Sequence, residues 1–469
     1  MRVPPLNLRV PSLKVSAVLV LLMLGFGVLI GEAARSSVRD RLLASRRSRL
    51  ELLVPRHPAA ASPHTSTPAP ATETAASEPL ESEAAPTPAP TAKHAPPARK
   101  PAAKAPSGET HKQAAQRQPD SKLPAIKHVF VIMLSEEPYA AVFGPESVAR
   151  YLTGKLEPQG ALLDHYDAVA HEGLADEIAL LSGQGPTSET AGDCANYTPI
   201  QPTSIAADEQ VLGSGCVYPA STLTLPGQLS AKHLSWRAYV GGIDEPGSAS
   251  GACAHPALGS ADPSSAASAS GPYATWINPI AYFGSLVGTP ACQSDDVGLS
   301  TLAHDLARPA RTASFSYIAP SRCEDGNPTP CAPGAAAGLA PADAFLKRVV
   351  PEILASKAYK QSGLLVITVD QAPSSGAFAD SSSCCGQPAY PNLPAALSET
   401  ATGRPRGGGA VGALLLSPFI KGPETSQEPY NHFSLLASIE AIFALKRLGY
   451  AALPAVKPLE ASLFSEPPS

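Results

Sequence analysis

Two stretches of consecutive apolar residues, at 128–134 and 364–369, stand out along the chain. Each places large or β-branched side chains at successive positions, a pattern typical of a strand buried on both faces of a parallel sheet. The second stretch ends on Asp370. Because ligands and metals in open α/β sheets bind at the carboxyl ends of such strands, Asp370 stands where chemistry is expected.

Shorter patterns fill in the rest of the folded part. They predict a single α/β domain over 124–469, with a mostly parallel central sheet and helices on both faces. Further strands are expected at 233–240, 312–318 and 410–416, and helices at 174–181, 297–306, 340–359 and 432–448. A segment of this length is sufficient to bury a large core.

The N-terminus has the layout of an export signal. Arg2, Arg9 and Lys14 precede an apolar stretch at 15–31, which is about 25 Å long as a helix and thus near the short limit for a membrane span. A clean small-residue cleavage site is not evident, so we expect an uncleaved transmembrane signal anchor over 1–34. Cleavage would instead give a secreted protein.

The composition of residues 35–123 predicts a basic juxtamembrane segment followed by an unstructured linker rich in Pro and Ala. Arginines that follow the apolar stretch favour a cytoplasmic location for this side by the positive-inside rule. The cysteines favour the opposite orientation, and we expect an extracytoplasmic C-terminal domain at the cell membrane.

All eight cysteines follow the linker and lack repeated CxxC spacing, which indicates disulfides formed in an oxidising compartment. Cys323 and Cys331 flank a turn-rich loop suited to a local bridge. Proximity favours Cys194–Cys216 and Cys253–Cys292, and Cys384 and Cys385 pair either elsewhere or with each other. The net charge of −5 gives no footprint for nucleic-acid binding.

The order of these segments resembles the phosphoesterase family of bacterial phospholipases C and acid phosphatases, in the alkaline-phosphatase-like superfamily. The resemblance spans 126–464 and rests on 126–134, 340–370, 407–418 and 430–436. It implies an alkaline-phosphatase-like fold. It also implies a Ser or Thr nucleophile at a helix N-terminus, divalent cations held by carboxylates, Asn and His, and further groups that assist the leaving oxygen.

Carried over by position, the nucleophile segment of the family falls on His171–Asp176, which places Gly173 where the hydroxyl belongs. Glycine has no group that attacks phosphorus, so no catalytic residue is assigned. The adjacent Glu172 would repel a phosphate dianion. Six positions depart from the family pattern: Ser135, Gly173, Asp176, Ile277, Asn327 and Gln371.

Four remaining side chains form a candidate site for a divalent metal: Asp370, His432, Glu136 and Asp325. Mixed oxygen and nitrogen ligands of this kind suit Zn, Mn or Mg. The alternative is structural, with Asp370 a hydrogen-bonded carboxylate at a strand end and His432 a residue at a helix start. His171 has the same two readings. No cofactor is firmly assigned.

Two functional classes remain open. The chain is either a membrane-anchored member of the family that has lost catalysis and serves as a binding or structural module, with an unknown partner in the cell envelope, or an active metal-dependent hydrolase of phosphate esters with a rearranged site. We favour the first. Metal content and turnover of phosphate esters separate the two.

Overall fold

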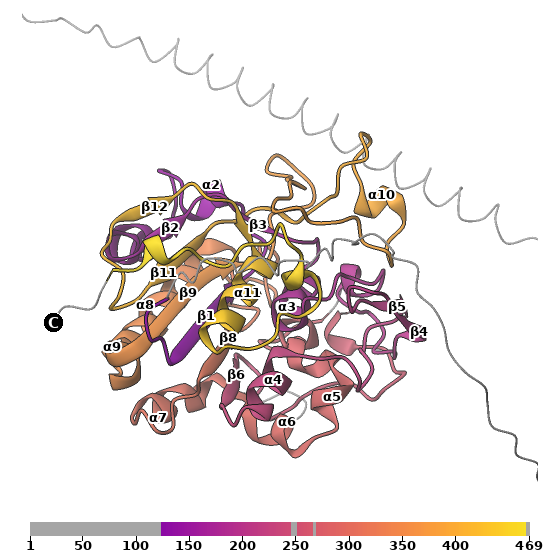
Figure 1. Cartoon of the computed structure of the whole chain (residues 1–469), viewed down its shortest axis with the longest axis horizontal. Coiled ribbons are helices and arrows are strands. Elements are labelled where there is room, and N and C mark those ends of the chain that lie inside the picture. Colours follow the sequence, from indigo (N-terminus) through magenta and orange to yellow (C-terminus); the bar gives the residue numbers. More distant parts are fainter. Residues whose placement is uncertain (1–122, 245–250, 266–268, 466–469) are drawn as a thin grey trace, which may run out of the picture. The chain divides into compact units, whose positions relative to one another are not determined.

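An eight-stranded sheet forms the centre of the computed structural model, which describes residues 123–244, 251–265 and 269–465. Figure 1 shows this sheet with helices packed around it. The strand order is β12-β2-β11-β9-β1-β8-β6-β7. The strands are β1 (His128–Leu134), β2 (Ala161–Leu163), β6 (Trp236–Val240), β7 (Asp296–Gly298), β8 (Phe315–Ala319), β9 (Gly363–Val369), β11 (Ala413–Leu416) and β12 (Glu424–Ser426).

The sheet is mostly parallel. β9, β1, β8, β6 and β7 run parallel to one another, whereas β11 runs antiparallel between β9 and β2. Every residue of β9 is buried, as are Val129–Leu134 of β1, so both faces of the sheet are covered. The expected fold class is therefore confirmed.

Two groups of helices accompany the sheet. α3 (Gly173–Ser182) packs against α11 (His432–Ile442), while α8 (Leu339–Ala355) contacts α7 (Leu302–Leu306) and α9 (Lys357–Ser362). Shorter elements complete the described chain: α2 (Tyr139–Val142), α4 (Leu225–Ala231), α5 (Gly284–Val287), α6 (Pro290–Asp295) and α10 (Ala395–Ser398), the hairpin β4 (Gln201–Ile205) and β5 (Val211–Ser214), and a small sheet of β10 (Gly409–Ala410), β3 (Tyr166–Ala168) and β13 (Tyr430–Asn431).

Several expected boundaries differ for local reasons. The helix expected over 340–359 is two helices, because Ser356 is extended (φ −64°, ψ 148°) and its hydroxyl caps α9 by accepting from the N–H of Tyr359. The strand expected over 410–416 is split into β10 and β11 at Gly412, whose φ is 75°. The helix expected to reach 448 ends at Ile442, just before Ala444 with a φ of 53°.

The helix expected over 297–306 is also shorter than its pattern suggests. Its first residues instead extend the sheet as β7 beside β6, and the α-helix begins only at Leu302. Short apolar segments are compatible with a strand or a helix, so pairing with a neighbouring strand decides between them.

The described chain contains four disulfides. Cys194–Cys216, Cys253–Cys292 and Cys323–Cys331 form as expected, and Cys384 is bonded to its neighbour Cys385. Within the described residues, no helix has both the length and the apolar character needed to cross a membrane. The expected signal anchor and, apart from Leu123, the expected linker lie outside the described residues.

Candidate functional site

The carboxyl ends of β1 and β9 lie side by side, with Leu134 in register with Val369. The residues that follow, Ser135 and Glu136 on one strand and Asp370 on the other, are therefore brought to the same edge of the sheet. This is the edge at which open α/β sheets bind their ligands.

Asp370 is held by backbone donors. Its Oδ1 accepts hydrogen bonds from the N–H groups of Glu136 (2.8 Å) and Gln371 (2.5 Å). Glu136 reaches this position with a φ of 52°, a left-handed conformation that is costly for a residue with a side chain. Burial raises the pKa of Asp370 to about 8, although these hydrogen bonds favour the charged form.

Gly173 is the first residue of α3 and faces this carboxylate. A Cβ added to Gly173 would overlap Asp370 Oδ2 and would lie 2.9 Å from Asp370 Cγ. Both residues are buried. The space into which a side chain at 173 would extend is thus filled by Asp370, so the position lacks a hydroxyl and also the room for one.

His432 begins α11, where Asn431 caps the helix by accepting from the N–H of Ser434 (3.0 Å). Its Nε2 lies 2.9 Å from the backbone oxygen of Asp370, and its Nδ1 lies 2.8 Å from the hydroxyl of Tyr166. Because a carbonyl oxygen only accepts, Nε2 is the donor, and Nδ1 accepts from Tyr166. Burial lowers the pKa of His432 to about 4, which keeps the ring neutral.

The other two candidate ligands, Glu136 and Asp325, both contact Asn327 in a neighbouring loop. Glu136 Oε2 accepts from the amide of Asn327 (3.1 Å), and Asp325 Oδ1 accepts from the N–H of the same residue (2.9 Å). Burial raises the pKa of Glu136, helped by the charge of Glu172. Burial also raises the pKa of Asp325 to about 7, and its Oδ2 is buried without a hydrogen-bond partner.

The four candidate ligands do not form a compact donor set. Among the described residues, the one group of three or more His, Cys, Asp or Glu with ligand atoms within 4.8 Å of one another is Cys253, Cys292 and Asp296. The two sulfurs of that group are bonded to each other, so it offers no thiolate. With both nitrogens of His432 engaged, the chain as folded does not fit the metal centre that the resemblance implies.

His171 and Ile277 also have structural contacts within the protein. The two ring nitrogens of His171 contact Gln371 Oε1 (2.9 Å) and Ser381 Oγ (3.0 Å). Ile277 is buried in a short helical turn, next to Asn278, whose amide donates to Asp296 (2.8 Å). Position 277 thus contributes to the core, and the neighbouring asparagine satisfies a buried acid.

Asp176 is a buried anchor of the chain segment before α3. Its Oδ1 accepts from the N–H groups of Val169 (2.6 Å) and Ala170 (3.1 Å) and lies 3.5 Å from His432 Nε2. Burial raises its pKa well above the usual range, with a further contribution from the charge of Asp370. This substitution therefore supports local structure.

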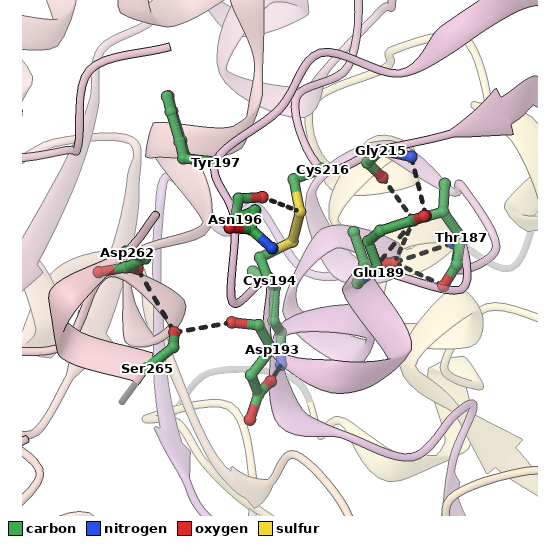
Figure 2. Close-up of a disulfide and its surroundings, with 12 residues drawn as sticks. Thr187, Glu189, Asp193, Cys194, Asn196, Tyr197, Gly215, Cys216, Asp262 and Ser265 are labelled. Carbon is green, nitrogen blue, oxygen red and sulfur yellow. Dashed lines mark hydrogen bonds between the residues drawn. A yellow bond between two sulfur atoms is a disulfide. The ribbon is translucent and has the colours of Figure 1, made fainter. Parts of the chain in front are cut away.

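Sequence reasoning missed two acids near the start of α3, Glu177 and Asp193. Burial raises the pKa of both, and the charge of Asp370 adds to the effect. Asp193 Oδ1 accepts from the N–H of Leu174 (3.3 Å), and its backbone oxygen accepts from Ser265 (3.0 Å). Figure 2 shows Asp193 directly beside the Cys194–Cys216 disulfide, so its cysteine neighbour was the available signal.

Acidic side chains dominate the surroundings of Gly173. Six acids are linked to one another by mutual repulsion or by shared partners: Glu136, Glu172, Asp176, Glu177, Asp193 and Asp370. In the described part of the chain, none of these six pairs with Lys or Arg within 4.0 Å. Such a field disfavours a phosphate dianion and favours protonated carboxyls.

Comparisons with known proteins agree with the sequence pattern. The family model described as "Phosphoesterase family" matches residues 143–446. A comparison with curated proteins gave no significant match.

Similar solved structures include a protein in the alkaline phosphatase superfamily from Vibrio parahaemolyticus (10% identity, 72% of each chain, TM-score 0.40). Others are the lipoteichoic acid synthase LtaP from Listeria monocytogenes (9% identity, 72% of this chain and 76% of that one, TM-score 0.37) and a phosphonate monoester hydrolase from Silicibacter pomeroyi (10% identity, 73% and 78%, TM-score 0.38).

Proposed function

Since this chain belongs to the Phosphoesterase family, whose model matches 143–446, we propose that it is a member that has lost phosphate-ester hydrolysis and acts as a binding or structural module in the cell envelope. The family is one of hydrolases, and the proposed loss is inferred from the residues that this chain carries at the site.

The observation that carries the proposal is the pairing of Gly173 with Asp370. Covalent phosphoryl transfer needs a hydroxyl at the helix N-terminus and a cation beside it. Here the hydroxyl is replaced by hydrogen, and the neighbouring carboxylate fills the space that remains. Without the nucleophile the rate falls by several orders of magnitude, roughly 10⁶-fold in a well-studied hydrolase.

Two features support a location outside the cytoplasm. All eight cysteines of the chain are paired in disulfides, which persist in oxidising compartments. The apolar stretch at 15–31 follows basic residues, as in an export signal. We therefore propose a single-pass protein that holds its C-terminal domain on the extracytoplasmic side, with the linker as a spacer.

One observation favours the alternative of an active hydrolase with a rearranged site. Asp325 Oδ2 is buried without a partner, beside Glu136 and at the same sheet edge as Asp370. An oxygen of this kind would be satisfied by a cation or by its own proton.

Turnover and metal content test the proposal together. Full-length protein is assayed with chromogenic phosphate monoesters and diesters, with and without added Zn²⁺, Mn²⁺ or Mg²⁺, and its bound metal is measured by mass spectrometry. We expect substoichiometric metal and no turnover above that of the buffer. Stoichiometric metal with turnover that Asp370→Ala abolishes would establish the alternative.

A further inference from the structure

A cavity of about 280 Å³ opens directly beside the site, lined in part by His171 and Glu172. This volume lies near the lower end of the range for small-molecule sites. The cavity lies between the segment before α3 and the loop that carries α10, so two segments far apart in sequence form its walls. The Gly173–Asp370 contact fills the position of the family's nucleophile, whereas this neighbouring cavity is open to a ligand.

Two charged side chains line the cavity without an ionic partner. Arg406 donates from Nε to the backbone oxygen of Glu399 (2.9 Å), and in the described chain no carboxylate lies within 4.0 Å of its nitrogens. Glu172 receives one long contact from Gln371 Nε2 (3.5 Å) and likewise has no Lys, Arg or His within 4.0 Å among the described residues. Both are partly buried.

The remaining lining is largely apolar. Tyr390, Leu393 and Leu397 contribute to the wall, and Tyr390 is fixed because its hydroxyl donates to the backbone oxygen of Val169 (2.6 Å). Leu397 is 58% exposed and lies at the rim of the cavity. Apolar area left exposed at a concave site gains free energy when a ligand covers it.

We propose that this cavity binds a small zwitterion with an apolar side chain, such as an apolar amino acid or dipeptide. The guanidinium of Arg406 matches a carboxylate through paired N–H donors, and the carboxylate of Glu172 matches a primary ammonium. The apolar wall accommodates the side chain. This inference rests on the proposed loss of hydrolysis, since it assigns the same region to binding.

The residues that line the cavity favour a zwitterion over a quaternary ammonium ion and over a phosphate dianion. A quaternary ammonium is held in a cage of several Trp, Tyr or Phe rings, and Tyr390 is the one residue of these three types among the described residues that line the cavity. A phosphate dianion needs more positive charge than one arginine, and Glu172 opposes it. A ligand that carries one charge of each sign satisfies both Arg406 and Glu172.

Calorimetric titration of the full-length protein in detergent tests the inference with three probes: L-leucine, L-leucinamide, which lacks the carboxylate, and N-acetyl-L-leucine, which lacks the ammonium. We expect leucine to bind about tenfold or more tightly than either blocked analogue, because each loses a charge-assisted contact. Arg406→Gln removes the preference over leucinamide, and Glu172→Gln removes the preference over N-acetyl-leucine.

Matched controls are Arg404→Gln and Glu146→Gln, both at exposed positions outside the cavity, which are expected to bind leucine as the unmodified protein does. Leu397→Ser is a further variant at an exposed position, and it should weaken leucine binding while glycine binding is unchanged. Circular dichroism checks that each variant is folded.

The inference is overturned if leucine gives no binding heat at about 10 mM, or if the blocked analogues bind as tightly as leucine. Phosphate-ester turnover is measured on the same samples. Absence of leucine binding without turnover overturns this inference alone, whereas turnover overturns the proposed loss of hydrolysis whatever leucine does.

Discussion

The carboxylate of Asp370 occupies the space that a side chain at position 173 would need, and Gly173 is the residue that permits it. The two come from different elements, the end of β9 and the start of α3, which the fold brings into contact. The lack of a hydroxyl at position 173 and the placement of the Asp370 carboxylate are therefore two sides of one packing contact.

Restoring the hydroxyl alone should be destabilising. Gly173→Ser places a Cβ against Asp370 Oδ2 in a buried site, so we expect the free energy of unfolding to fall by about 1–3 kcal/mol and no turnover to appear. Chemical denaturation and a phosphatase assay measure both. Gly154→Ala, where an added Cβ meets nothing within 4 Å, serves as the control and should cause no loss. An active, stable Gly173→Ser variant would contradict this interpretation.

Asp176 should stabilise the fold through the hydrogen bonds that its side-chain oxygen accepts. Asp176→Ala leaves the buried N–H groups of Val169 and Ala170 without their acceptor, so we expect a loss of roughly 2–4 kcal/mol in unfolding free energy. Asp176→Asn keeps an acceptor oxygen and removes the ionisable group. It should be at least as stable as the unmodified protein at pH 8, as measured by urea unfolding. Equal losses in both variants would show that the charge itself is required.

Asp296 should make stability depend on pH. Burial raises its pKa to about 7, so the folded protein binds a proton more tightly than the unfolded chain. Its contribution is fully present below pH 4 and is lost as pH rises from about 4 to 7. Asp296→Asn removes this loss and adds an amide donor near Asn278 Oδ1, which is buried without a partner.

We therefore expect the Asp296→Asn variant to be more stable at pH 8 by roughly 1–4 kcal/mol, with a much smaller difference near pH 4. Thermal melts across this range measure the effect. The variant Glu146→Gln, which removes a carboxylate at an exposed position, is the control. A difference that does not change with pH would exclude the titration of Asp296 as its origin.

The disulfides should differ in their contribution to stability. Cys194–Cys216 closes 22 residues, and replacing both cysteines by serine should cost about 3 kcal/mol in the chain-entropy model. Cys384 and Cys385 are adjacent, so their bond closes no loop, and the same double replacement should cost little. Denaturation of the two double variants compares them directly. Similar losses would mean that the adjacent pair stabilises the fold by other contacts.

The pattern of apolar residues was sufficient to identify the two central strands. Continuous apolar stretches predict β1 and β9, and their parallel pairing brings Glu136 and Asp370 together as expected. The boundaries were harder, because Ser356 and Gly412 break their elements through single backbone conformations that composition does not reveal.

The sequence predicted which positions of the site depart from the family pattern. It did not predict which residues these positions contact. Gly173 is visible in the sequence, yet its overlap with Asp370 depends on the packing of α3 against the sheet. The hydrogen bonds of His432 to Tyr166 and to the backbone of Asp370 join residues far apart in the chain. Glu177 was missed because nothing in a single sequence marks a carboxyl as buried, and Asp193 because its only signal was the neighbouring Cys194.

The tight fit between α3 and the end of β9 also bears on how this lineage can change. A codon change that introduces serine or threonine at 173 places a side chain in an occupied volume, and we expect the variant to lose stability. A second replacement that frees the space now filled by Asp370 would have to accompany it. Packing alone thus makes a hydroxyl at position 173 hard to acquire by a single mutational step.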